Sequence, residues 1–177
     1  MGDKAEKNDL NNHKALDPKI AHGIWEMIGN QTAIKSRAQF RAYVSSAQSN
    51  ITHNTWIKVV LDGESFDAGG YFDAVTDYDF TAPTDGLYAL KGQVKLTSVK
   101  VNTNNYLAIY KNGAAISTTY VAGNGIGQNI VMQVNDFVQL AADDLITLYV
   151  YSGADDTTDI VTGEANSFLC GHMVALV

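Results

Sequence analysis

The stretch "YDFTAPTDGLYAL", residues 78–90, decides the fold of this 177-residue chain. Pro83, one of only two prolines, is expected to end a strand, because its ring fixes φ and its nitrogen carries no hydrogen. Asp85 and Gly86 then supply a turn and allow a close approach of the backbone. We therefore expect a tight corner before the next strand, with Phe80 and Tyr88 packed on either side of it.

Residues 86–99, which follow this corner, carry the longest strand pattern of the chain. The even positions are apolar or small: Tyr88, Leu90, Gly92, Val94 and Leu96. The odd positions from 91 onward are polar: Lys91, Gln93, Lys95 and Thr97. Since successive side chains of a strand point to opposite faces, the pattern predicts a half-buried antiparallel strand.

Short strand patterns recur every 8 to 15 residues from Phe40 onward, and turn residues separate them. The expected strands are 39–46, 55–61, 71–75, 86–99, 104–111, 115–121, 128–140, 144–152 and 167–176. Asn112 and Gly113 predict a hairpin between two of them, because both residues tolerate positive φ. This series of short strands indicates an all-β sandwich or barrel over residues 39–177.

Residues 1–38 form a different segment, polar except for one short amphipathic helix expected at about 17–29. Pro18 suits its first position, Asp17 caps it, and Gly29 ends it. Its apolar stripe consists of Ile20, Ile24, Met27 and Ile28, with Trp25 at the edge. A helix this short is marginal alone. We interpret the stripe as an anchor for another protein; the alternative is a helix packed on its own domain.

Composition narrows the range of functions. Charged residues make up 18% of the chain, below the usual quarter, which suggests that sister subunits cover part of the surface. Residues 1–41 carry seven basic and five acidic groups, a net +2, and the remaining 136 residues carry five and fourteen, a net −9. An acidic body argues against nucleic-acid binding. We expect no membrane span, no secretion signal and, with Cys170 alone, no intrachain disulfide.

The sequence contains only weak motifs for metal binding and none for nucleophilic catalysis. Asp62, Asp67 and Asp73 lie in an acidic, glycine-containing stretch and are weak candidate calcium ligands; we favour the interpretation that they belong to solvated acidic loops. The four histidines and Cys170 lack the spacing of a zinc site, and no nucleophile motif is present. We expect a protein that is not an enzyme and has no cofactor.

The spacing of Phe80, Gly86 and Tyr88 resembles a pattern of the tumour necrosis factor (TNF) superfamily and of the globular heads of the first complement component. That pattern is an aromatic residue, five residues, Gly, any residue, Tyr. Further similar stretches are "LAIYKNG" (107–113), "VQLAADDLITLYV" (138–150) and "SFLCGHMVAL" (167–176), the last containing Phe168 and Gly171. The resemblance covers about residues 40–177. It implies a jelly roll of about ten strands and a compact homotrimer with aromatic side chains at the threefold axis, which the nine tyrosines fit.

We consider three functions. The favoured one is a bacteriophage virion structural protein, a trimeric capsid decoration or head-fibre protein on the virion surface, anchored to the major capsid protein by its N-terminal arm. The second is a tail-fibre knob that recognises a host-surface glycan. The third is a secreted TNF-like ligand, against which the polar start and the lack of disulfides argue. A tail fibre needs a long shaft between its anchor and its knob. The short N-terminal arm therefore favours a protein attached directly to the capsid surface.

Overall fold

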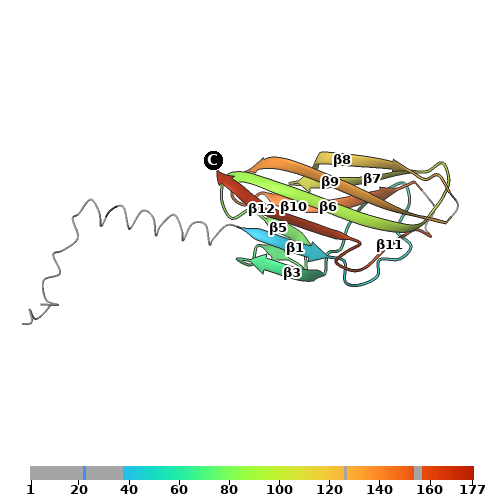
Figure 1. The fold of residues 1–177 in the computed structure, drawn as a ribbon, viewed down its shortest axis with the longest axis horizontal. Helices are drawn as coiled ribbons and strands as arrows, with labels where there is room; N and C mark the ends of the chain where they lie inside the picture. The colour runs from blue at the N-terminus through green and yellow to red at the C-terminus, as the bar shows by residue number, and fades with distance from the viewer. Residues whose placement is uncertain (1–21, 23–37, 126, 154–156) are drawn as a thin grey trace, which may run out of the picture. The chain divides into compact units, whose positions relative to one another are not determined.

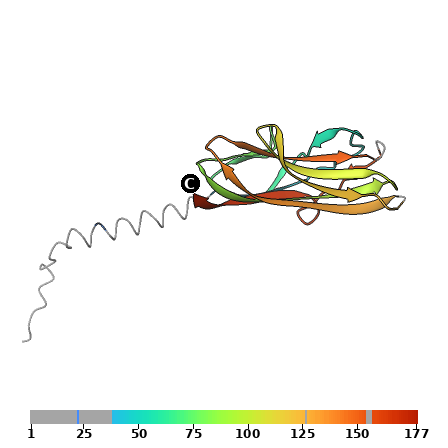
Figure 2. The same cartoon turned by 90° about the horizontal axis from the view of Figure 1, so that it is seen from above.

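The computed structural model describes His22 and residues 38–125, 127–153 and 157–177. In this part of the chain all regular structure from Ala38 onward is β, and Figures 1 and 2 show the strands in two layers. The strands are β1 (Gln39–Tyr43), β2 (Trp56–Lys58), β3 (Gly63–Ala68), β4 (Phe72–Asp73), β5 (Asp79–Thr81), β6 (Gly86–Val99), β7 (Asn104–Lys111), β8 (Ala114–Ala122), β9 (Gln128–Leu140), β10 (Leu145–Ser152), β11 (Asp159–Ile160) and β12 (Phe168–Leu176). The expected all-β sandwich is confirmed.

Each layer is one antiparallel sheet. Sheet A has the order β3-β1-β12-β6-β9, with β11 pairing the end of β6 beyond β12. Sheet B has the order β4-β5-β10-β7-β8, with β2 pairing β10. Strands adjacent in sequence therefore often lie in different sheets, as in a jelly roll.

Each of the nine predicted ranges overlaps one observed strand, whereas β3, β5 and β11 were not predicted. Strands β5 and β11 have only three and two residues, and β3 (sequence GESFDA) has no apolar alternation and no buried side chain. Strand β3 forms because its backbone pairs with β1, with Phe66 opposite Arg41. Tertiary pairing thus overrides a weak local preference.

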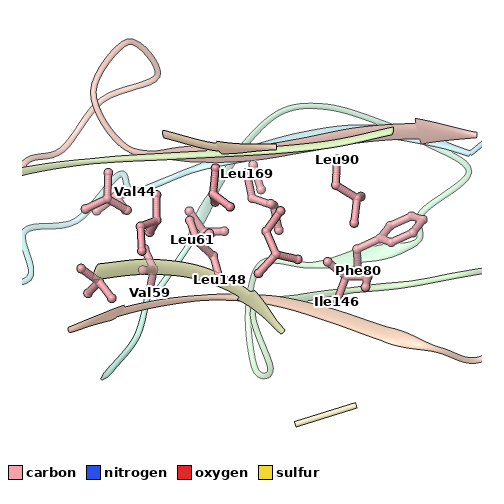
Figure 3. Packing of buried hydrophobic residues seen from close by; sticks show 14 of the residues in the cluster. Val44, Val59, Leu61, Phe80, Leu90, Ile146, Leu148 and Leu169 are labelled. Atoms are coloured by element: carbon pink, nitrogen blue, oxygen red, sulfur yellow. The ribbon is translucent and has the colours of Figure 1, made fainter. Parts of the chain in front are cut away.

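The core lies between the two sheets, as Figure 3 shows for Leu90 and Leu169 of sheet A facing Ile146 and Leu148 of sheet B. The even positions of β6 from Tyr88 to Leu96 point into it, as predicted. Aromatic packing closes one end: the Phe80 ring stacks on Phe40 at 4.4 Å between centroids and lies 5.8 Å from Tyr88.

The corner before β6 is tight, and of the two purposes expected of its glycine, a turn and a close backbone approach, the structure shows the close approach. Gly86 does not have positive φ; instead, a Cβ on it would lie 2.7 Å from the carbonyl oxygen of Ala175 in β12. The corner is held from both sides of the turn. The Tyr88 hydroxyl donates to the carbonyl oxygen of Thr84 (3.0 Å), and Asp85 Oδ1 accepts from the Ala142 N–H (2.8 Å).

The β7–β8 hairpin turns at Asn112 and Gly113, whose φ values are 50° and 81°. Its tip is tied to the turn before β10 through Asp144. Asn112 Nδ2 donates to Asp144 Oδ1 (2.7 Å), and Lys111 Nζ lies 2.6 Å from Asp144 Oδ2. Partial burial works to raise the pKa of Asp144, but the hydrogen bonds from Lys111, the Ala141 N–H and Asn112 outweigh it and lower that pKa.

We expect Asp144→Asn to lower the free energy of unfolding by about 1.5 kcal/mol at pH 7, because hydrogen bonds to a charged group are lost. A lowered pKa means that Asp144 stabilises the fold above the unfolded-state pKa of about 4 and ceases to do so as the pH falls through the folded-state value. Urea unfolding at pH 7 and pH 3 should therefore show a difference between variant and parent that shrinks in acid. Asp143→Asn, at the exposed neighbouring position, is the control. A gap that stays constant with pH would contradict this role.

Candidate interaction surfaces

The face of sheet A that points away from the core carries side chains from five strands in register. One row contains Phe66, Arg41, Cys170, Lys91 and Asn135; the next contains Ala68, Gln39, His172, Ala89 and Phe137. Phe66 and Phe137 stand at opposite sides of this face and are 49% and 69% exposed. The face thus has exposed aromatic rings at its sides and mostly polar side chains between them.

A hollow of about 320 Å³ lies on this face beside Phe66. Its lining includes Gln39, Phe66, Ala89, Cys170 and His172, with the floor at Gly171. Gly171 has no space for a side chain, since a Cβ there would lie 2.7 Å from Leu90 Cδ2 and 3.0 Å from Phe40 Cε1. The glycine predicted from the last-strand pattern therefore lets β12 pack onto the core.

Phe168 and Cys170 follow the same alternation in β12 and also lie on the outward side of sheet A. The Arg41 guanidinium carbon lies 3.9 Å from the centroid of the Phe168 ring, and the same guanidinium donates to the carbonyl oxygen of Glu164 at 2.7 Å. This cover leaves Phe168 buried. Burial raises the pKa of the Cys170 thiol, although Arg41 and Lys91 act in the opposite direction.

The outer face of sheet B carries a second set of aromatic side chains. The register places Trp56 of β2, Tyr151 of β10, Tyr106 of β7 and Tyr120 of β8 side by side in one row across four adjacent strands. Tyr110 and Tyr149 lie next to the row. Local alternation in 144–152 and 104–111 indicates that these tyrosines share a face within each strand. Only the pairing of strands distant in sequence shows that they form a row, so sequence reasoning did not find it.

The carboxylates of the three calcium candidates accept hydrogen bonds from backbone N–H groups. Asp62 Oδ1 accepts from the N–H groups of Ser45 and Ser46, and Asp67 Oδ2 accepts from the Phe72 N–H. Asp73 Oδ1 accepts from the N–H groups of Val75 and Thr76, and these bonds lower its pKa.

The burial of Asp62 works to raise its pKa, but hydrogen bonds from Ser46 and Ser45 outweigh that effect and lower it. The described residues contain no group of three or more His, Cys, Asp or Glu side chains able to hold a metal ion. Asp62 directly precedes β3, Asp67 lies in β3 and Asp73 ends β4, and each carboxylate accepts hydrogen bonds from backbone N–H groups near it.

The predicted anchor residues Ile20, Ile24, Trp25, Met27 and Ile28 lie outside the described residues. In the part of the chain that is described, no helix is long and apolar enough to cross a membrane.

Comparison with solved structures identifies the fold. Murine APRIL has a TM-score of 0.58 at 13% identity, over 78% of this chain and 99% of that one. The globular domain of zebrafish complement 1qA gives 0.58 at 12% identity, over 77% and 97%. Eiger TNF from S. frugiperda gives 0.55 at 14% identity, over 80% and 93%.

No protein-family model matches the sequence, and no curated protein matches it. At this level of identity the similarity establishes the TNF-like β-sandwich that the spacing of Phe80, Gly86 and Tyr88 led us to expect.

Proposed function

We propose that this chain is a structural, non-enzymatic head protein: a homotrimer of TNF-like sandwiches displayed on the surface of a bacteriophage particle. Residues 1–38 anchor it to the major capsid protein. The observation that carries the trimer is the outer face of sheet A, where a hollow lies beside Phe66 and two exposed phenylalanine rings stand at opposite sides of the face.

The distribution of exposed apolar side chains supports sheet A as the subunit interface. Among the described residues, Phe66, Val131 and Phe137 expose between 49% and 69% of their surface on its strands β3 and β9. Burial of such side chains contributes roughly 1.5–3 kcal/mol each. On sheet B the large side chains instead pack against one another, and of the row only Tyr120 exposes as much as half of its surface. Association through sheet A therefore removes more apolar surface from water.

The anchoring part of the proposal rests on the sequence of the arm. The apolar stripe around Ile24 and Trp25 lies in an otherwise polar segment, and the net +2 of residues 1–41 contrasts with the net −9 of the rest. A trimer presents three such stripes, so weak single contacts add up through effective concentration. The positive charge adds a salt-sensitive attraction to an acidic shell.

Replacing Ile24 and Trp25 together by Asp is expected to leave the trimer folded and to abolish its binding to capsids. The measurement is co-sedimentation of purified protein with particles that lack it. His22→Asp combined with Gln31→Asp, which adds two carboxylates outside the stripe, should still bind. If the Ile24 and Trp25 variant decorates particles at full occupancy, or if its trimer dissociates, the anchor assignment fails. Immunogold labelling at the tail tip instead of the head would favour the tail-fibre knob.

A further inference from the structure

The row of aromatic side chains on sheet B crosses four neighbouring strands without interruption. Ring centroids are 5.8 Å apart for Trp56 and Tyr151, 5.6 Å for Tyr151 and Tyr106, and 5.2 Å for Tyr106 and Tyr120. We propose that this row is a binding site for neutral oligosaccharides. The inference goes beyond the structural role proposed above and does not depend on where the head is mounted.

The row is not part of the sandwich core. In β7 the side chains of Leu107 and Ile109 point into the core, whereas Tyr106 and Tyr110 lie on the opposite face. The aromatic rings of the row contact one another, and all four remain at least partly accessible. Their packing contributes little to holding the two sheets together. The presence of four aromatic residues in register on this outer face therefore needs another explanation.

The row has the dimensions of a short sugar chain. Neighbouring strands lie about 4.8 Å apart, so a row across four of them is about 14 Å long. Two further rings widen it: Tyr110 lies 5.9 Å from Trp56, and Tyr149 lies 4.3 Å from Tyr110. The result is an aromatic surface several sugar rings long and about two aromatic side chains wide at the Trp56 end.

The polar groups of the row lie at its edges. Tyr151 donates its hydroxyl proton to Asn54 Oδ1 (3.0 Å) near one end, and Tyr120 donates to Asn104 Oδ1 (3.1 Å) at the other. Both asparagines are exposed, and each side-chain amide also has two N–H donors. Aromatic faces bordered by hydroxyl and amide groups are complementary to a pyranose, which has C–H faces and hydroxyl edges.

The charges beside the row favour a neutral ligand. The register places Lys58, Tyr149, Ala108 and Thr118 in the next row, so Lys58 is the charged side chain there. Its Nζ lies 3.8 Å from Asp79 Oδ2, and Lys111, beyond Tyr110, is paired with Asp144 at 2.6 Å. Both lysines have acidic partners within the protein, so this surface offers little net charge to sialic acid, sulfate or phosphate groups.

The test uses the full chain carrying Trp25→Phe, which leaves Trp56 as its single tryptophan. Fluorescence is titrated with maltohexaose, cellohexaose and the hexamer of N-acetylglucosamine, and with sialyllactose and a heparin hexasaccharide as anionic probes. We expect a saturable change with at least one neutral oligosaccharide. Tyr106→Ala and, separately, Tyr120→Ala at the more exposed end should weaken it by about tenfold, the effect of losing one stacking contact. Ile116→Ala, a similarly placed change in β8, should leave affinity unchanged.

Three results would overturn the inference. The first is no saturable change with any of the neutral oligosaccharides. The second is preferential binding of the anionic probes. The third is a loss of subunit association in the folded Tyr106 or Tyr120 variant, which would assign the row to a protein interface. Because the fluorescence assay uses purified protein without capsids, a failure to decorate capsids does not affect the sugar-binding result. In the same way, a failure to bind sugars does not affect the test of capsid binding.

Discussion

Phe80→Ala is expected to lower the free energy of unfolding by about 3–5 kcal/mol, the range for removing a fully buried phenylalanine ring. Phe80 is 0% exposed and stacks on Phe40 with 4.4 Å between ring centroids and 12° between ring planes. It also contacts Tyr88, the first core residue of β6. The loss of the ring therefore leaves a cavity between the two sheets at the corner where they are joined.

Urea denaturation followed by circular dichroism measures this change. Val75→Ala, in the loop before β5 and 82% exposed, is the control and should alter stability by no more than about 0.5 kcal/mol. Similar losses for the two variants would contradict the view that the stacked rings are a main element of the core.

Gly86→Val is expected to cost about 3 kcal/mol or more, at the upper end of overpacking effects. The added Cβ would lie 2.7 Å from the Ala175 carbonyl oxygen, which belongs to the backbone of β12. That oxygen cannot retreat without disturbing the β6–β12 ladder. The two methyl groups of valine would also lie near Tyr88 Cε2 and Met173 Cε, which are 3.4 and 3.5 Å from the Cβ position.

Gly125→Ala is the matched control for this substitution. A Cβ at Gly125 would meet its nearest neighbour, Gln128 Oε1, at 3.6 Å, an ordinary van der Waals distance. Its unfolding midpoint should stay close to that of the parent. Equal shifts of the midpoint for Gly86→Val and Gly125→Ala would show that the close approach of β12 is not what requires the glycine.

The elements that the sequence predicts well are those that carry their own periodic pattern. In β6 one side chain in two enters the core, so alternation identifies the strand and the face that each residue occupies. Strand β3 has no such pattern, because it forms only by pairing with β1 at the edge of sheet A. The sequence predicts that a glycine is needed at position 86. It does not tell whether the glycine is needed for a turn or for a close approach of another strand, because either requirement places a glycine there.

The surfaces were harder to predict than the strands, because they depend on register between distant strands. Trp56 and Tyr151 are neighbours across β2 and β10, yet 95 positions separate them in the chain. For the acidic residues, the local sequence indicated a function that the structure explains in another way. Asp73 lies in an acidic, glycine-containing stretch of the kind that binds calcium, and only the structure shows that it ends β4 and accepts hydrogen bonds from the N–H groups of Val75 and Thr76.

The mass of the protein in solution tests the central claim, assembly through the outer face of sheet A. Sedimentation equilibrium of the full chain should give three times the chain mass of 19.1 kDa. The combined variant Phe66→Asp and Phe137→Asp should give the single-chain mass while keeping its β-sheet circular dichroism spectrum, because both side chains are exposed in one subunit. A parent protein that sediments at 19.1 kDa, or a combined variant that remains trimeric, would contradict the account.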